Sequence, residues 1–448
     1  MALGVGLTVM VMSISGVVTK SLERNGNVGY NLIIGAKGGS TQLVFNSVYY
    51  LSAPVENLKY SYYMEFLPGN GRQEQFAKLG GNLKDPDRTG KYSMFTTNGF
   101  VIPLCLGDYV GRFRAVATTP DFFNVLKHGD RNEDPYTFSV GRNFVEDSPE
   151  HGLFEAVLGY EVASEMELKV GDKIQASHGA SGDFVHEQAF TVVGILDATG
   201  TPNDRAAFMN MEGFYLLEDH AAPERDEESG LEKRKLKKNE ALPETLSTDV
   251  PPPDTVDADV PAKSQKLLPI EKREVTAILL RSEFAMGMQK QINKTPSAQA
   301  VSPIQEIGAL LQIFIQPLQW ALLTLTILVC VVSAVSILVS IYNSMSERTR
   351  DIAVMRALGA SRDTVLLVIL FEACIIAILG GAIGWVGGHA LAAWASPLVE
   401  ARTGVKLSFL SINYPNELWI IPSLIITGIL AGLIPALVAY RTDVSKSL

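Results

Sequence analysis

The chain has 448 residues, of which 47% are hydrophobic and 19% are charged, and its formal net charge at pH 7 is −10. This acidic balance argues against a nucleic-acid partner, because binding to the phosphate backbone needs a basic face. The apolar residues are concentrated toward the two ends of the chain, which excludes an ordinary soluble globular protein.

The first apolar run, Ala2–Val18, is slightly short for a membrane span, and no basic residue precedes it. A helix needs about 20 apolar residues to cross the hydrocarbon core. We expect residues 1–19 to form a first transmembrane helix whose cytoplasmic start is missing from this chain. A cleaved signal peptide is the alternative, although neither a basic start nor a small-residue cleavage site is obvious.

The long segment 20–305 has the pattern of an α+β domain. Phe190–Leu196 and Glu274–Leu280 are short runs typical of strands. Between Val162 and Leu168, apolar residues recur at helical spacing, and Gly171 then marks a turn. The segment contains one cysteine, Cys105, so we expect it to fold without an internal disulfide.

Residues 221–266 differ from the rest of this segment. They contain no aromatic residue and no isoleucine, and they are rich in proline and in charges of both signs. Such a composition cannot bury enough apolar surface to offset the entropy of ordering. The sequence therefore predicts a disordered insertion, with a docking arm for a partner as the alternative.

Three further spans are predicted with longer apolar runs. We assign them to residues 306–343, 363–395 and 417–440, whose apolar centres are Trp320–Ile341, Thr364–Trp394 and Leu418–Tyr440. Buried core helices are a poor alternative, because core helices rarely run this long without a polar face.

The basic residues of the short loops set the orientation. Residues 344–362 carry four arginines and the tail 441–448 carries Arg441 and Lys446, so both are expected to be cytoplasmic. The loop 396–416 then faces outward, and so does the domain 20–305. The predicted fold class is a membrane protein with four transmembrane helices and a large extracytoplasmic α+β domain, both termini being cytoplasmic.

The cytoplasmic segment 344–362 has the pattern of a short amphipathic helix. Ser346 can cap its start, and Ile352, Met355 and Leu358 form one narrow apolar stripe. Gly359 would end the helix, and Ser361 would cap the next one. Physical reasoning leaves two interpretations open: the helix fits a groove on another protein, or it lies in the lipid headgroups.

Polar and small residues stand out within the spans. Glu372 is the one acidic residue in a predicted span interior, and we expect it to face a partner permease or an adjacent span, or to lie near enough to the interface to be hydrated. The glycines are spaced so that helices can approach closely, and their expected role is packing. They are Gly380, Gly384, Gly388, Gly428 and Gly432.

The sequence lacks the motifs of several chemical functions. Gly35–Thr41 superficially resembles a phosphate-binding loop, but Lys37 precedes its glycines, so the chain is not expected to bind a nucleotide. No hydrolase or metalloprotease motif occurs. His128, His151, His178 and His186 show no ligand spacing and are expected to be solvated. We therefore expect no catalytic residue, no metal site and no bound cofactor.

The segment ERTRDIAVMRALGAS resembles the coupling-helix region of the FtsX/MacB family of ABC permeases, which includes MacB-type exporters and LolC and LolE lipoprotein-release subunits. Residues 156–174 and 190–209 resemble the family's periplasmic core domain, residues 35–51 resemble a subgroup of uncharacterised permeases in it, and residues 435–448 resemble its C-terminal end. The resemblance covers nearly the whole chain except the insertion.

This resemblance implies a non-catalytic permease subunit in the inner membrane, paired with a like permease as a homodimer or heterodimer. A separate ABC ATPase would bind ATP and Mg²⁺, and a periplasmic adaptor or outer-membrane channel could join them. By matching position, the residues that would contact or orient the ATPase are Glu347, Arg348, Asp351, Ile352, Met355, Arg356 and Gly359.

The resemblance also implies that ATP hydrolysis moves the outer domain through the spans. The expected function is export or extraction of an amphiphile such as a lipoprotein, lipid, peptide or drug. The alternative is an FtsX-like signalling scaffold that activates an extracytoplasmic partner without transport. The outer domain is larger than is typical of FtsX, which favours the transporter.

Overall fold

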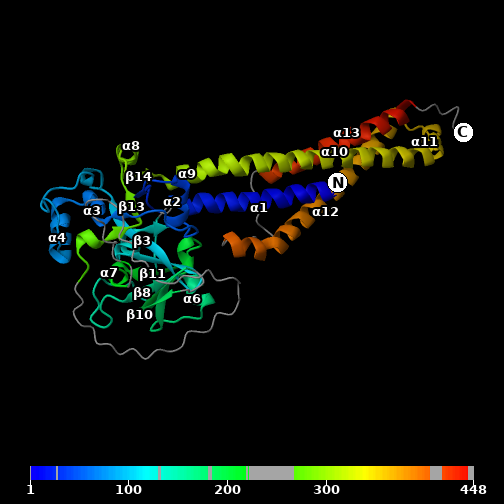
Figure 1. Ribbon diagram of the computed structural model, residues 1–448. Coiled ribbons are helices and arrows are strands. Elements are labelled where there is room, and N and C mark those ends of the chain that lie inside the picture. The colour runs from blue at the N-terminus through cyan, green and yellow to red at the C-terminus, as the bar shows by residue number, and fades with distance from the viewer. Residues whose placement is uncertain are drawn as a thin grey trace, which may run out of the picture. The chain divides into compact units, whose positions relative to one another are not determined.

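The computed structural model describes residues 2–26, 29–129, 133–179, 184–217, 220, 267–403 and 416–441 (Figure 1). The chain divides into two compact units. We call Arg24–Glu306 the sheet unit, and Met1–Glu23 together with Ile307–Leu448 the helical unit. The predicted insertion 221–266 lies outside the described residues, so its disorder stays a prediction.

The sheet unit is built on one ten-stranded sheet. Its strands are β1 (Leu32–Ala36), β3 (Phe100–Val110), β4 (Phe113–Thr118), β7 (Phe138–Gly141), β8 (Glu155–Leu158), β9 (Lys173–His178), β10 (Phe184–Leu196), β11 (Ala206–Asn210), β13 (Ala277–Arg281) and β14 (Ala298–Val301). The spatial order is β14-β1-β13-β3-β4-β11-β8-β10-β7, and β9 pairs with both β10 and β3. The sheet is mixed, because β4 and β11 are parallel and β3 and β4 are antiparallel.

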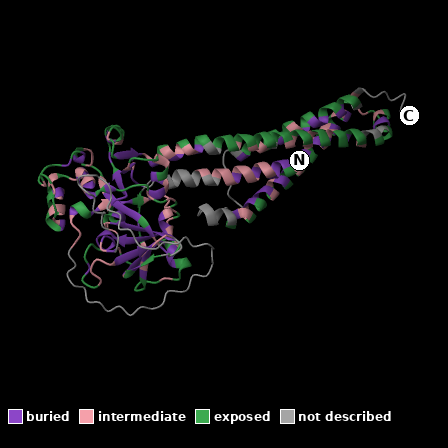
Figure 2. Cartoon of the chain, viewed as in Figure 1, coloured by how far each residue is buried: buried purple, intermediate pink, exposed green. Residues whose placement is uncertain are grey.

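Short strands and helices accompany this sheet in the sheet unit. The two-residue strands are β2 (Leu58–Lys59), β5 (Lys127–His128), β6 (Asp134–Pro135) and β12 (Glu274–Val275). The helices are α2 (Ser40–Ser47), α3 (Tyr60–Tyr63), α4 (Gly69–Leu79), α5 (Asp121–Val125), α6 (Tyr160–Glu165), α7 (Met211–Phe214) and α8 (Ala285–Asn293). Buried residues are concentrated in the sheet (Figure 2). The predicted α+β pattern is therefore present.

The two predicted strands are found with one difference. Phe190–Leu196 forms the second half of β10, as expected. The run Glu274–Leu280 is divided between β12 and β13 at Thr276, whose hydroxyl donates to the Leu106 carbonyl at 3.2 Å. A side-chain bond to the neighbouring strand thus accompanies the break.

The helical spacing predicted from Val162 to Leu168 continues beyond the helix that the structure contains. Helix α6 ends at Glu165, and Glu167 has a φ of 56°, which a continuing α-helix cannot contain. The turn that follows is found at Gly171, with a φ of 101°. Of the two apolar residues after α6, Leu168 still packs on the core and Met166 is exposed, so the spacing continued beyond the helix itself.

The helical unit contains the long apolar helices. They are α1 (Ala2–Gly26), whose last residues belong to the sheet unit, α10 (Gln316–Glu347), α12 (Arg362–Thr403) and α13 (Ile420–Arg441). The shorter helices are α9 (Pro303–Leu310), whose first residues belong to the sheet unit, and α11 (Thr349–Ala357). A π-helical turn, Leu311–Ile315, joins α9 to α10. The predicted loop 396–416 begins inside a helix, since α12 continues past Pro397 to Thr403.

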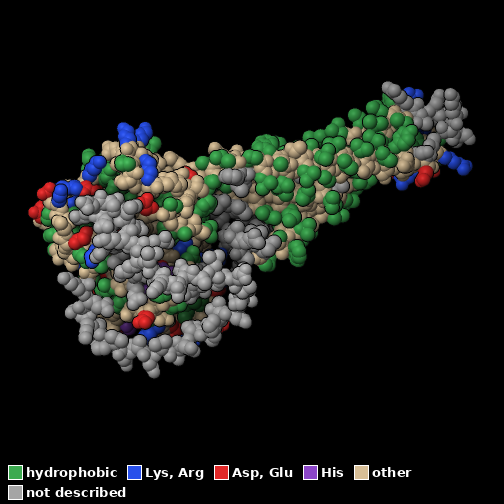
Figure 3. Space-filling view, viewed as in Figure 1, with side chains coloured by type: hydrophobic (Ala, Val, Ile, Leu, Met, Phe, Trp, Pro, Cys, Tyr) green, Lys and Arg blue, Asp and Glu red, His purple; other side chains and the backbone are tan. Residues whose placement is uncertain are grey.

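Three of the described helical segments are long and apolar enough to cross a membrane. They are Pro303–Ser344, Arg362–Pro397 and Glu417–Val438. Ala2–Gly16 is a shorter apolar helix. The surface of these helices is largely hydrophobic, and charged side chains gather at the end that carries α11 (Figure 3). The chain is thus a membrane protein by composition, while a count of four spans stays a prediction.

Candidate functional site

The helix between the second and third predicted spans ends where the sequence indicates, but it begins later than predicted. Helix α10 continues through Ser346 to Glu347, and Arg348 is the first residue outside α11. Ser346 therefore lies inside the preceding helix and does not begin the next one. The direct passage from α10 to α11 leaves a single residue between two helices.

The end of α11 agrees with the prediction. Gly359 has a φ of 103°, and its amide donates to the Arg356 carbonyl, while the amide of Ala360 donates to the Met355 carbonyl. These two bonds form a Schellman motif, which glycine favours because it has no Cβ. The Ser361 hydroxyl accepts from the Thr364 amide at 3.1 Å and so caps α12.

The three residues of the predicted apolar stripe on α11 differ in burial. Ile352 is 8% exposed and packs in a cluster with residues of α10, α12 and α13. Met355 is 41% exposed and Leu358 is 84% exposed. Ile352 thus holds α11 to the chain's own helices, and Met355 and Leu358 remain available to another surface.

Charged residues surround this exposed apolar patch. Glu347, Arg348 and Asp351 are exposed, and Arg356 is half-buried. Arg348 Nη1 lies 3.5 Å from Glu372 Oε1, and the two side chains are 60% and 40% exposed. Glu372 therefore faces an adjacent element of its own chain and remains partly accessible, and the ion pair ties the start of α11 to α12.

Glycines line the contacts between the helices. A Cβ on Gly384 would lie 2.4 Å from the Ala2 carbonyl oxygen, and one on Gly388 would lie 2.6 Å from that of Gly6. A Cβ on Gly432 would lie 2.6 Å from the Ala373 Cβ, and one on Gly428 would lie 3.0 Å from the Cys374 Cα. Helix α12 thus packs closely on α1 and α13. Gly380 lies on the same helix and is half-buried.

A buried polar cluster in the helical unit was missed by the sequence analysis. His389 Nε2 lies 3.2 Å from Glu417 Oε2, and the Trp385 indole donates to the same oxygen at 3.3 Å. The His389 side chain is 0% exposed and that of Glu417 is 5% exposed. Glu417 is the first residue of its predicted span. An acidic residue at such a boundary is expected to be solvated, so its position did not indicate that its side chain is buried.

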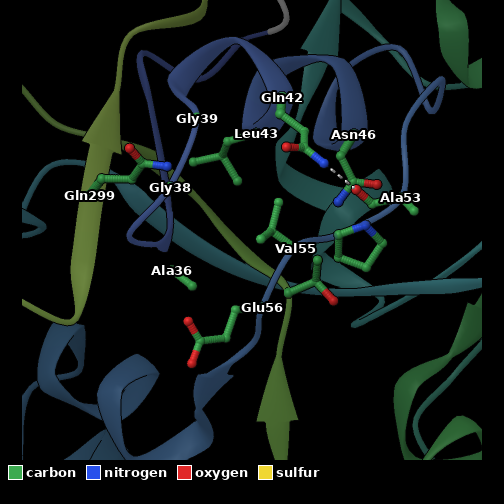
Figure 4. A pocket seen from close by; sticks show the side chains of 12 residues that line it. Ala36, Gly38, Gly39, Gln42, Leu43, Asn46, Ala53, Val55, Glu56 and Gln299 are labelled. Carbon is green, nitrogen blue, oxygen red and sulfur yellow. Dashed lines mark hydrogen bonds between the residues drawn. The ribbon is translucent and has the colours of Figure 1, made fainter.

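The loop that resembles a phosphate site uses its polar groups internally. Ser40 and Thr41 both donate hydrogen bonds to Glu306 Oε1, and the Lys37 ammonium donates to the Asn293 and Thr295 carbonyls. The hollow beside this loop is lined by Gly38, Gly39 and mostly uncharged side chains (Figure 4). This arrangement offers no cationic cradle for a phosphate.

The histidines depart most from the sequence prediction. His178 and His186 were expected to be scattered and solvated, but they lie together with His220 around the Asp108 carboxylate. The His186 side chain is 1% exposed and that of Asp108 is 2% exposed. Ligand spacing along the chain was the wrong criterion here, since strand pairing brings these residues together. His128 and His151 are half-buried and lie outside this group.

Comparison with known families gives two matches along the chain. Residues 1–258 match the MacB-like periplasmic core domain, which is more than half of the chain. Residues 299–444 match the FtsX-like permease C-terminal family, and this range includes α10 to α13.

Individual relatives match a shorter stretch. A protein named "Macrolide export ATP-binding/permease protein MacB" from Brucella abortus is 35% identical over 128 residues, which is 26% of this chain and 18% of the relative. A MacB of the same description from Hahella chejuensis is 33% identical over 132 residues, 28% of this chain and 19% of the relative. "ABC transporter permease YtrF" from Bacillus subtilis is 32% identical over 127 residues, 26% of this chain and 29% of the relative. The matched stretch is less than a third of each relative's length.

Proposed function

This chain belongs to the FtsX-like permeases with a MacB-like periplasmic core domain, and from that premise we propose that it is the membrane subunit of an ABC transporter. A separate ATPase would dock on α11, and ATP hydrolysis there would move the sheet unit through the spans. The proposed cargo is an amphiphile such as a lipoprotein, lipid, peptide or drug.

The topology that we propose has four spans, formed by α1, α10, α12 and α13. The basic residues of 344–362 favour a cytoplasmic α11, and the sheet unit would then lie on the outer side of the inner membrane. The chain would pair with a second permease, and two ATPase subunits would bind the pair.

The observation that carries this proposal is the division of α11 into an anchored and an exposed side. An interfacial helix that only rests on lipid does not need a rigid attachment to the spans. Here Ile352 is buried against α10, α12 and α13, and Gly359 and Ser361 fix the start of α12. A push on Met355 or Leu358 would therefore reach the neighbouring helices, which is what coupling requires.

We predict that Leu358→Asp and Met355→Asp each weaken ATPase binding by at least about 30-fold, because a hot-spot side chain contributes about 2 kcal/mol or more. The tagged full-length chain is purified from its own host in detergent. The co-purified protein is identified by mass spectrometry, and its ATP hydrolysis is measured.

The matched control is Leu51→Asp, because Leu51 is 71% exposed in the sheet unit and undergoes the same chemical change. It should leave recovery of the ATPase unchanged. Normal ATPase recovery with both α11 variants would refute docking at α11. Recovery of no ATP-hydrolysing partner by the wild-type chain would refute the transporter assignment itself.

A second prediction concerns the Arg348–Glu372 pair. Arg348→Glu places two carboxylates side by side and should lower the ATP hydrolysis of the purified complex by a few fold. The double variant Arg348→Glu/Glu372→Arg should restore the rate, because it brings opposite charges together again with their positions exchanged. The effect should be small, since an exposed ion pair contributes only about 0.2–1 kcal/mol. A double variant no better than the single one would show that this pair does not transmit the motion.

A further inference from the structure

Four side chains from distant parts of the sequence meet at one place in the sheet unit. Asp108 in β3 and His178 at the end of β9 are direct partners across antiparallel strands. His178 also pairs with Phe184 of β10, two residues before His186. His220 follows α7 and completes the group, which we call the histidine cluster.

The atoms of the histidine cluster converge. His186 Nε2 lies 3.0 Å from Asp108 Oδ2, and His220 Nε2 lies 3.1 Å from the same oxygen. The two imidazole Nε2 atoms are 3.1 Å apart, and His178 Nδ1 lies 3.1 Å from Asp108 Oδ1. One ligand atom from each of the four side chains lies within 4.8 Å of all the others.

These separations match the spacing of ligands around one metal ion. Zinc binds imidazole nitrogen and carboxylate oxygen at about 2.0–2.1 Å, so neighbouring ligand atoms of a tetrahedral site are about 3.3 Å apart. We propose that Asp108, His178, His186 and His220 bind one Zn²⁺ ion. Because all four positions would be filled by protein, the site is structural and not catalytic.

Hydrogen bonding alone accounts poorly for this arrangement. An imidazole nitrogen carries at most one hydrogen, which points in one direction. His186 Nε2 and His220 Nε2 each lie within 3.1 Å of the other and of Asp108 Oδ2. A triangle of three such atoms cannot hold three well-aligned hydrogen bonds, whereas an ion above its centre, on the side of the fourth ligand, would bind all three.

The charge states of the cluster also suit a cation. Burial opposes ionisation of Asp108, but a hydrogen bond and charge interactions with the three histidines keep the pKa of its carboxyl below the usual range. Burial lowers the pKa of His186, and neighbouring histidines lower it further against the opposing effect of Asp108. Both directions favour the deprotonated carboxylate and the neutral ring, which are the forms that bind a metal ion.

Nitrogen-rich donors favour zinc and neighbouring transition ions over calcium and magnesium, which prefer oxygen ligands. The His178 side chain is 43% exposed and offers an entry path from solvent. The ion would join β3, β9 and β10 to His220, the last described residue before 221–266. The site would thus fix the start of that segment to the sheet.

The test uses the full-length chain purified in detergent with an affinity tag that contains no histidine. Metal content is measured by elemental mass spectrometry, before and after treatment with a chelator. Zinc affinity is then measured by competition with a chromophoric indicator. We expect one zinc per chain, restored when zinc is added back and not displaced by excess Mg²⁺ or Ca²⁺.

The variants His220→Gln and His178→Gln remove one ligand each and should lower zinc affinity by more than about 100-fold, since even second-shell changes lower it by about 10- to 100-fold. His151→Gln is the matched control, because His151 is outside the cluster, and it should bind zinc like the wild type. Circular dichroism shows whether each variant is folded. A folded wild-type chain that takes up no zinc, or variants that bind it as tightly as the control, would overturn the proposal.

Discussion

Replacing Gly388 with valine should displace α1 from α12. A Cβ at this position would lie 2.6 Å from the Gly6 carbonyl oxygen and 2.8 Å from the Val9 Cβ, so the collision involves the neighbouring helix itself and not a flexible side-chain end. Overpacking of this kind costs about 1–3 kcal/mol or more. Since each 1.4 kcal/mol is tenfold, the native helix pair should be populated at least about fivefold less.

A disulfide can report this displacement. A Cβ built on Gly4 lies 3.5 Å from Cys330 Sγ in α10, so Gly4→Cys should cross-link to Cys330 under oxidation. The linked peptides are quantified by mass spectrometry. Adding Gly388→Val should reduce the cross-link, because α1 can no longer occupy its place beside α12.

The adjacent glycine supplies the control. A Cβ on Gly387 has no atom within 4 Å, so Gly387→Val makes the same change on the same helix without a collision. It should leave the cross-link intact. Equal effects of the two valines would show that the glycine contact does not position α1, and unchanged cross-linking with Gly388→Val would show the same.

The features predicted from the sequence are those that local chemistry determines. The apolar runs of α10, α12 and α13 are long enough to be recognised one segment at a time. The helix end at Gly359 and the cap at Ser361 follow from the residue types at two positions. The start at Ser346 was wrong because α10 continues past a capable cap, and the apolar stretch before it favours the longer helix.

The features that were missed depend on contacts between distant segments. Nothing in the spacing of Ile352 and Met355 tells which one packs inward, because the answer depends on α12 and α13. The histidine cluster joins Asp108 to His220 across more than a hundred residues, through strand pairings that periodicity does not show. The Glu417–His389 contact likewise needs two spans to be placed side by side.

The second large effect is expected at Glu212 in α7. Its carboxylate accepts two hydrogen bonds from the Arg273 guanidinium, at 3.1 and 2.6 Å. The Arg273 side chain is 0% exposed and that of Glu212 is 9% exposed, and the guanidinium lies over the Tyr60 and Tyr215 rings. Glu212 precedes residues 221–266 and Arg273 follows them. The pair therefore connects the two parts of the sheet unit that this segment separates along the sequence.

Glu212→Ala leaves the Arg273 charge buried without its partner, and breaking a buried pair in this way costs about 3–5 kcal/mol. For a unit of this size the melting temperature of the full-length chain, followed by circular dichroism in detergent, should fall by roughly 6–20 °C.

Glu165→Ala is the matched control, because its pair with Arg112 is exposed and contributes about 0–1 kcal/mol. The double variant Glu212→Ala/Arg273→Met removes both charges and should recover part of the loss, since the penalty comes from the unpaired arginine and not from the absence of the pair. If the double variant melts no higher than Glu212→Ala, the stability of this corner depends on packing around Arg273 and not on its charge.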